Sequence, residues 1–309
     1  MKQPLVSIIT VNYNQPVLTC ELLASVKKLQ YQNYEVIVVD NGSKVNMPDI
    51  IKRNYPDVQL ICSNTNLGFA GGNNLGIKAA HGEYLFLVNN DVELNPNVLD
   101  KLLPVFEQYK NAGVVCPKIC YHLSAASKDG KPLIQYVGYT PVNPYTARNS
   151  TIGEYEPDQG QYNKITQTPY AHGAAMLISR TAIEKTGLMP ENYFLYYEEL
   201  DWCEQIRRMG FSIWVEPEAT VYHKESMSVG KTNPLKTYFL TRNRILFMRR
   251  NASTWQLIVF LLFFTFVTLP KNIVLYIVKR QYTHLRSFLQ GVFWHLGVKK
   301  NKLYHVNPA

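Results

Sequence analysis

The sequence predicts an α/β protein with a doubly wound, mostly parallel sheet and a basic, aromatic helical segment at its C-terminal end. Three observations support this fold class. Short runs rich in β-branched residues alternate with stretches of helical periodicity in the first part of the chain. Polar turn residues follow three of these runs, where each strand would end. The last 84 residues, 226–309, contain 13 Lys and Arg and no Asp or Glu.

Length and composition exclude a disordered chain and a disulfide-stapled scaffold. The chain has 309 residues, of which 46% are hydrophobic and 12% aromatic, enough to fill a large core. Its net charge of +9 arises in the C-terminal part, because the remaining 225 residues carry 32 − 13 = 19 basic and 23 acidic side chains. The five cysteines are an odd number, which favours free thiols in a reducing cytosol.

The first elements form a βαβ unit. Residues 5–11 are a short apolar run of the kind buried in a parallel sheet. Residues 17–29 place apolar side chains four positions apart, which predicts a helix. Residues 34–39 return as a second apolar strand, so the three segments together predict parallel pairing through a helical crossover.

Two further strands are predicted at residues 58–62 and 84–88, with a glycine-rich loop at 66–74 and a short helix at 73–80 between them. The glycines lack the G-x-G-x-x-G spacing, which argues against a dinucleotide-binding dehydrogenase. Backbone N–H groups of this loop could still approach a phosphate at the start of the following helix.

Polar clusters at residues 12–14, 40–43 and 89–91 follow three predicted strands. Each cluster alone could be an ordinary turn. In a doubly wound sheet, however, ligands bind beyond the carboxyl ends of the strands, where these clusters meet. Asp91 and Glu93 lie just past a buried strand and could be solvated, or could hold a divalent cation that bridges phosphates.

A second cluster of candidate functional residues lies between residues 193 and 223. Residues 196–202 place three acids beside Tyr and Trp at the start of a helix that ends at Gly210. Acids in a first helical turn are favoured by the helix dipole, and a carboxylate among aromatic rings can also serve as a general base. Strands predicted at 212–215 and 219–222 leave His223 at a strand end, where it can complete a metal site with Asp91.

The C-terminal segment predicts association with a membrane surface. Residues 257–269 are nearly all apolar, yet 13 residues of helix span only about 20 Å, less than a bilayer core of about 30 Å. Pro270 interrupts the run, and basic pairs flank it at 249–250 and 279–280, which favours a hairpin or interfacial helices. A kinked single span, a buried helix and a dimer contact remain alternatives.

A basic nucleic-acid-binding protein is a competing interpretation, because aromatic and basic side chains together can stack bases and bind phosphates. The contiguous apolar run argues against it, and the acidic body would repel a polyanion. We therefore expect a lipid surface as the partner, and no nucleic acid.

The ordered motifs of the chain resemble the inverting GT-A glycosyltransferases of family 2, particularly their rhamnosyltransferase-like branch. The motifs cover roughly residues 5–250 and are residues 6–14, 38–43, 66–74, 87–91, 172–177, 196–201, 222–223 and 242–244. By this resemblance, residues 1–225 would be a GT-A catalytic domain and residues 226–309 a membrane-associating helical region.

The resemblance also implies roles for individual residues. Asp91 and His223 would hold Mg²⁺ or Mn²⁺ on the donor diphosphate, although Asn89 stands where a generic DXD motif has its first Asp. Glu199 would be the base, with Glu198 and Asp201 as alternatives, because Glu-Glu replaces the usual Glu-Asp. Asp40 would bind the nucleotide base. The full set of expected donor-binding residues is Thr10, Asn12, Asn14, Asp40, Gly42, Asn66, Gly68, Gly71, Asn74, Asn89, Asn90, Arg242 and Asn243.

These inferences predict a sugar transfer with inversion from a nucleotide-diphosphate donor, dTDP-rhamnose being favoured, to a hydroxyl of a lipid-linked saccharide. A divalent cation stabilises the leaving diphosphate, so one carboxylate base suffices. The expected setting is surface polysaccharide or glycolipid synthesis at the cytoplasmic face of the inner membrane, with residues 124–164 as an acceptor-side loop region. A catalytically impaired sugar-nucleotide-binding protein is the alternative, and the oligomeric state is open.

Overall fold

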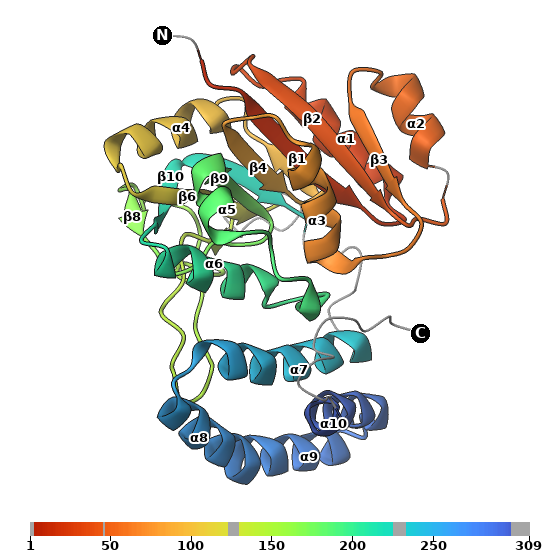
Figure 1. The fold of residues 1–309 in the computed structure, drawn as a ribbon, viewed down its shortest axis with the longest axis vertical. Helices are drawn as coiled ribbons and strands as arrows, with labels where there is room; N and C mark the ends of the chain where they lie inside the picture. The colour runs from red at the N-terminus through yellow and green to blue at the C-terminus, as the bar shows by residue number, and fades with distance from the viewer. Residues whose placement is uncertain (1–2, 46, 123–129, 225–232, 298–309) are drawn as a thin grey trace.

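The computed structural model describes residues 3–45, 47–122, 130–224 and 233–297, and its centre is one ten-stranded sheet (Figure 1). The strand order is β3-β2-β1-β4-β9-β6-β10-β5, with β7 paired to β6 and β8 to β10. The strands are β1 (Val6–Asn12), β2 (Tyr34–Asn41), β3 (Gln59–Ser63), β4 (Tyr84–Val88), β5 (Val92–Leu94), β6 (Ala112–Tyr121), β7 (Ile134–Tyr136), β8 (Thr166–Gln167), β9 (Ala175–Ser179) and β10 (Ser212–His223).

Helices cover both faces of this sheet and form a further layer below it (Figure 1). They are α1 (Pro16–Val26), α2 (Met47–Asn54), α3 (Gly68–Ala79), α4 (Val98–Gln108), α5 (Arg180–Thr186), α6 (Glu198–Arg208), α7 (Pro234–Asn251), α8 (Thr254–Phe263), α9 (Leu269–Val278) and α10 (Tyr282–Gly297). A 3₁₀ turn, η2 (Glu191–Tyr193), precedes α6, and a π-helical turn, η3 (Phe264–Thr268), joins α8 to α9.

The predicted α/β class is confirmed. Strands β3, β2, β1 and β4 pair in parallel, and their apolar side chains are buried in the main core. The predicted strand β4 has the bounds expected for it. The two strands predicted at 212–215 and 219–222 are instead one long strand, β10, with a register irregularity between Glu216 and Thr220. Strand β9 joins the two halves of the sheet by pairing antiparallel with both β4 and β6.

The glycine-rich segment is helical, and the prediction of a loop over residues 66–74 is wrong. Helix α3 begins at Gly68 and packs on β1 and β2. A Cβ on Gly72 would lie 2.8 Å from Cγ1 of Val11, and one on Gly76 would lie 2.3 Å from Cγ2 of Ile9. These glycines therefore allow the helix to lie close against the sheet.

The predicted break at Pro270 is also wrong, because residues 254–278 form one continuous 25-residue helix. The proline lies in the first turn of α9, directly after the π turn, where the N–H of Leu269 donates to the carbonyl of Phe264. The wider π turn accommodates the residue that lacks an N–H. This helix is long and apolar enough to span a membrane, and only 17% of its most apolar window is buried.

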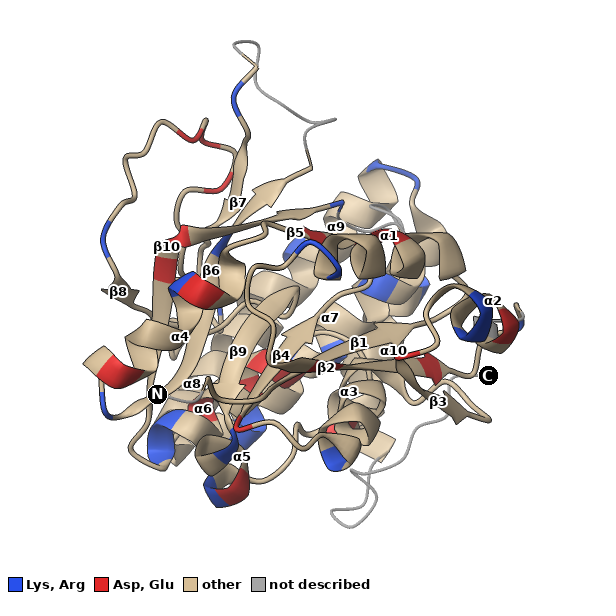
Figure 2. Cartoon of the chain, turned by 90° about the horizontal axis from the view of Figure 1, so that it is seen from above, with Lys and Arg blue, Asp and Glu red and all other residues tan. Residues whose placement is uncertain are grey.

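Helix α7 lies between the sheet-bearing body and helices α8–α10 (Figure 1). Its residues Leu246 and Phe247 share a hydrophobic cluster with Tyr193 of the body and with Phe260 and Phe288 of the lower layer. The body carries acidic side chains on α2, α4, α5 and α6, whereas α7–α10 carry none (Figure 2). The division of the chain at residue 225 into two domains stays a prediction.

Candidate active site

The carboxyl ends of β1 and β2 form the first wall of the site. Asn12 and Asp40 are register partners, and the amide of Asn12 donates to Asp40 Oδ1 at 3.1 Å and to Ser43 Oγ at 3.1 Å. Its carbonyl oxygen accepts from the backbone N–H of Gln15 and the hydroxyl of Thr19. All polar capacity of Asn12 is thus used inside the protein, so its role is to orient Asp40 and not to contact a donor.

The turns after β1 and β2 are held by left-handed backbone. Asn14 has φ 58° and its side-chain oxygen accepts from the N–H of Lys44 at 2.7 Å. Gly42 has φ 75°, and a Cβ there would lie 2.5 Å from the carbonyl carbon of Thr65. Both residues shape the turn that presents Asp40, whereas Thr10, also expected in this wall, is fully buried within β1 with an unpaired hydroxyl.

Three N–H groups at the start of α3 are hydrogen-bonded within the protein. The N–H of Leu67 donates to Asn41 Oδ1 at 2.9 Å, that of Gly68 to Asn66 Oδ1 at 2.9 Å, and that of Phe69 to the carbonyl of Phe194 at 2.8 Å. These three N–H groups are therefore already occupied, and phosphate binding at this helix start stays a prediction.

Two other expected donor residues of α3 also serve packing. Asn74 donates to the carbonyl of Met189 and to Glu191, both at 2.8 Å. A Cβ on Gly71 would lie 2.7 Å from Cβ of Leu67, so this position is closed by the preceding turn. Asn74 thus ties α3 to the 189–191 segment.

The end of β4 brings Asp91 to His223. The backbone N–H of Asn89 donates to Ala174, and Asn90 donates to Thr19 Oγ1 at 3.1 Å, which fixes the residues before Asp91. Strand β5 then pairs antiparallel with β10 and sets Val92 opposite His223. As a result Asp91 Oδ1 lies 3.1 Å from Nε2 of His223, and both side chains are more than nine-tenths buried.

The hydrogen bonding of this pair suits a cation. Nδ1 of His223 lies 2.8 Å from Oε1 of Gln135, and an amide oxygen only accepts, so Nδ1 carries the proton. The second ring nitrogen, Nε2, faces Asp91 Oδ1, which is buried. A carboxylate and an imidazole nitrogen side by side in a buried site are ligand types that a bound metal ion would use.

The protein supplies only part of such a coordination shell. No group of three or more His, Cys, Asp and Glu side chains able to hold a metal occurs among the described residues. Mg²⁺ commonly takes one or two protein ligands and completes its shell with substrate phosphates and water. Asp91 and His223 thus fit an ion that is completed by a diphosphate.

Burial lowers the pKa of the neighbouring His172 to about 3, with a further contribution from His223. The two imidazole rings are 6.2 Å apart, and Nδ1 of His172 accepts from the N–H of Ala174. His172 is therefore neutral at physiological pH. It and Gln135 complete the surroundings of His223, and no sequence signal pointed to Gln135.

A strained loop precedes the acidic residues at the start of α6. Phe194, Tyr196 and Tyr197 have φ of 65°, 67° and 76°, values that are unusual for residues with side chains. Asn243 of α7 holds this loop by donating to the carbonyls of Tyr193, Leu195 and Tyr196 at 3.1, 2.7 and 2.8 Å.

Arg242, which is fully buried, holds the same loop by donating to the carbonyls of Asn192 and Tyr193. Its guanidinium also lies 4.9 Å from the ring centre of Phe239 and 5.0 Å from that of Trp294. In the structure both Arg242 and Asn243 hold the loop before α6, and their expected contact with the donor stays a prediction.

The three acids in the first turn of α6 have different environments. Both oxygens of Asp201 are bound, to Arg250 Nε at 2.6 Å and to Asn251 Nδ2 at 2.8 Å, which removes Asp201 as a candidate base. Burial, together with the neighbouring Glu199, raises the pKa of Glu198 well above its ordinary value. Burial raises the pKa of Glu199 to about 7, which suits a general base.

Glu199 is connected to the Asp91–His223 pair through Gly173 and His172. Its Cγ is 3.8 Å from where a Cβ on Gly173 would stand, and Gly173 adjoins His172, which in turn faces His223. The carboxyl ends of β4 and β10 and the first turn of α6 therefore meet at one place. The arrangement combines a candidate base, two candidate metal ligands and a carboxylate, Asp40, at the adjacent strand end.

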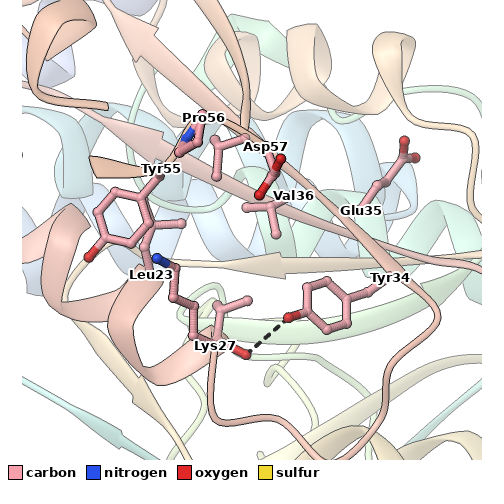
Figure 3. Close-up of a pocket in the computed structure, with 10 residues that line it drawn as sticks. Leu23, Lys27, Tyr34, Glu35, Val36, Tyr55, Pro56 and Asp57 are labelled. Atoms are coloured by element: carbon pink, nitrogen blue, oxygen red, sulfur yellow. Dashed lines mark hydrogen bonds between the residues drawn. The ribbon is translucent and has the colours of Figure 1, made fainter. Parts of the chain in front are cut away.

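A separate cavity of about 170 Å³ lies at the amino end of β2, between α1, β2 and the segment after α2 (Figure 3). Lys27 covers the ring of Tyr55 at 4.5 Å, and the hydroxyl of Tyr34 donates to the carbonyl of Val26 at 3.5 Å. None of the expected site residues lines it.

Comparison with known proteins agrees with this geometry. Residues 7–187 match the sequence profile of glycosyl transferase family 2, and the chain therefore belongs to that family. A low-salt glycan biosynthesis hexosyltransferase, Agl10 of Haloferax volcanii, is 27% identical over 78% of this chain and 74% of its own length.

Two rhamnosyltransferases are also similar. The N-acetylglucosaminyl-diphospho-decaprenol L-rhamnosyltransferase of Mycobacterium tuberculosis is 23% identical over 80% of this chain and 85% of its own. The dTDP-rhamnosyl transferase RfbF of Shigella flexneri is 24% identical over 88% of this chain and 90% of its own.

Solved structures show the GT-A fold. The mannosyltransferase PcManGT from Pyrobaculum calidifontis, in complex with GDP-Man and Mn²⁺, superposes with a TM-score of 0.58 at 15% identity and covers 97% of this chain and 89% of its own. S. aureus TarS 1–349 in complex with UDP-GlcNAc gives a TM-score of 0.58 at 19% identity, over 93% and 81% of the two chains.

Proposed function

We propose that this protein transfers a sugar, with inversion, from a nucleotide-diphosphate donor to a hydroxyl of a lipid-linked saccharide. The observation that carries the proposal is Glu199, whose pKa of about 7 suits proton removal from an attacking hydroxyl, and which Gly173 and His172 connect to the Asp91–His223 pair. Single displacement needs one such base, unlike glycoside hydrolysis, where two carboxyl groups flank the bond.

Each residue of the site has one task in this reaction. Asp40, oriented by Asn12, binds the nucleotide base, and Asp91 with His223 hold Mg²⁺ or Mn²⁺. When bound, the cation stabilises negative charge on the leaving diphosphate. Glu199 accepts the acceptor proton, and burial raises the pKa of Glu198 beside it, which favours the uncharged form of that carboxyl.

The relatives support the donor and acceptor classes. Two of them are named as rhamnosyltransferases, one acting with dTDP-rhamnose and one on a saccharide linked to a polyprenol by a diphosphate. We propose dTDP-rhamnose as the favoured donor and surface polysaccharide or glycolipid synthesis as the setting.

The lower layer supports location at the cytoplasmic face of the cell membrane. Its outward side chains include Trp255, Leu262 and Phe266, which are 66%, 53% and 72% exposed. So large an apolar surface suits lipid contact. Because one side of the 254–278 helix packs on α7 and α10, we propose that it lies in the interface and does not cross.

The test is a panel of nucleotide sugars, incubated with the purified protein and a lipid-linked acceptor, with and without a chelator. We expect nucleoside diphosphate to be released from one donor, dTDP-rhamnose first, and only when a divalent cation is present. Binding of nucleotide sugars with no release from any of them would favour the impaired binding protein instead.

A further inference from the structure

A cavity of about 380 Å³ lies between the catalytic body and the lower helical layer, next to the site but separate from the Asp91–His223 pair. Residues of the 147–149 segment, of Tyr197, of α7 and of the 254–278 helix line it. Tyr197 is the residue directly before Glu198 and Glu199, so the wall of this cavity continues into the turn that carries the base.

The cavity is positively charged. It is lined by Arg148, which is exposed, and by Arg244, which is half-buried. Neither forms an ion pair with an acid among the described residues, and no Asp or Glu lines the cavity. Arg244 is held in place by the carbonyl of Thr146 and by the rings of Phe260 and Phe264, 5.8 and 5.7 Å away.

Two further polar groups in the lining lack partners. Oγ1 of Thr268, a side chain that is 3% exposed, and Nδ2 of Asn149 are buried and form no hydrogen bond. Both can donate. Buried donors without acceptors are costly in a protein interior, so their presence beside two guanidinium groups that have no acidic partner indicates an anion with several acceptor oxygens.

The surroundings suit an anion that carries a lipid chain. Phe264, Tyr276 and Phe288 form the apolar side of the cavity. The helix that supplies Phe264 and Tyr276 also bears the exposed Phe266 and Val274 on its outer side, 72% and 59% exposed. One helix therefore links the cavity to the surface that we assign to the membrane.

We propose that this cavity binds the phosphate or diphosphate of the lipid-linked acceptor, with Arg148 and Arg244 as its principal contacts. The saccharide attached to that group would then extend past Tyr197 to Glu199. This inference rests on the proposed function for the identity of the acceptor, but binding at the cavity does not require turnover.

The test measures binding of farnesyl diphosphate to the full-length protein in detergent, with excess nucleoside diphosphate and Mg²⁺ present to block the donor site. Isothermal titration calorimetry should show binding, weakened about tenfold in Arg148→Gln and restored in part by Arg148→Lys. Arg286→Gln is the matched control, because it removes one exposed arginine from α10 outside the cavity and should leave the affinity unchanged.

Several outcomes would overturn the proposal. If Arg148→Gln and Arg286→Gln weaken the binding of farnesyl diphosphate equally, the effect comes from the net charge of the protein or from nonspecific attraction of anionic lipid, and not from the cavity. If farnesol binds as tightly as farnesyl diphosphate, the cavity does not recognise the anionic group. If inorganic pyrophosphate binds as tightly, the lipid chain does not contribute to the affinity.

A kinetic arm separates this inference from the proposed function. If the donor panel succeeds, Arg148→Gln should raise KM for the lipid-diphosphate acceptor about tenfold and leave KM for the donor unchanged. If the donor panel fails while farnesyl diphosphate binds as described, the function is wrong and the anion site stands.

Discussion

Replacement of Glu199 by Gln tests the proposed base through two independent quantities. Removing the carboxylate should lower kcat about 10²- to 10⁴-fold, the usual contribution of general base catalysis. In the unsubstituted enzyme, kcat/KM should rise about tenfold per pH unit below pH 7 and become level above it, because burial raises the pKa of Glu199 to about 7 and only the ionised form accepts a proton.

The same substitution should stabilise the fold at high pH. Burial raises the pKa of Glu199 from 4.5 in the unfolded chain to about 7. The folded state thus binds more protons than the unfolded state between these values, and stability falls as pH rises through this window. The increase of about 2.5 in pKa corresponds to a cost on the order of 3 kcal/mol, fully present above pH 7 and absent below about pH 4.

The assay combines rates of nucleoside diphosphate release with thermal unfolding at pH 5 and pH 8. We expect Glu199→Gln to have a higher Tm than the unsubstituted protein at pH 8, with a much smaller difference at pH 5. Glu184→Gln, a change at an exposed position of α5, is the matched control and should alter neither quantity. Turnover within about threefold of normal in Glu199→Gln would refute the assignment of the base.

Three further predictions concern the metal pair, the strained loop and the membrane surface. Asp91→Asn should reduce activity about 100-fold and flatten its dependence on Mg²⁺ and Mn²⁺, and an unaltered metal titration would count against the pair as ligands. Asn243→Leu removes three hydrogen bonds to the loop before α6 and should lower the free energy of unfolding by about 2–4 kcal/mol and reduce kcat more than it changes the donor KM. Urea denaturation and steady-state kinetics check this, and unchanged values would show that the loop holds its shape unaided. Leu262→Asp combined with Phe266→Asp should reduce co-sedimentation with anionic vesicles about tenfold or more while binding of the nucleotide sugar is preserved, and undiminished sedimentation would contradict the proposed lipid contact.

The first half of the fold could be predicted because its strands are short, buried and bounded by turn residues. Strand β6 was missed although all ten of its residues are buried, because Gly113, Pro117 and Lys118 interrupt its apolar pattern. The helical start of α3 was missed because glycine is unfavourable in helices, yet close packing on Val11 and Ile9 requires it there.

The candidate site could be predicted where its functional side chains come directly after a predicted strand. Asp91 and His223 were identified from their places after two predicted strands, and the structure brings them to 3.1 Å. The tasks of Asn12, Arg242 and Asn243 were not predictable, because a motif gives the residue type but not whether its hydrogen bonds are used inside the protein. Gln135 lies on β7, and only the tertiary fold shows that it faces His223.

Helix α6 and strand β10 are one continuous stretch of chain, and its two outer ends carry Glu199 and His223. The turn between them, residues 209–211, is exposed at Met209 and stands at the opposite end of both elements. A fluorophore or a pair of new chain termini introduced at this turn would therefore leave both reactive ends untouched, which makes it a natural place to attach a reporter or to divide the enzyme into two pieces.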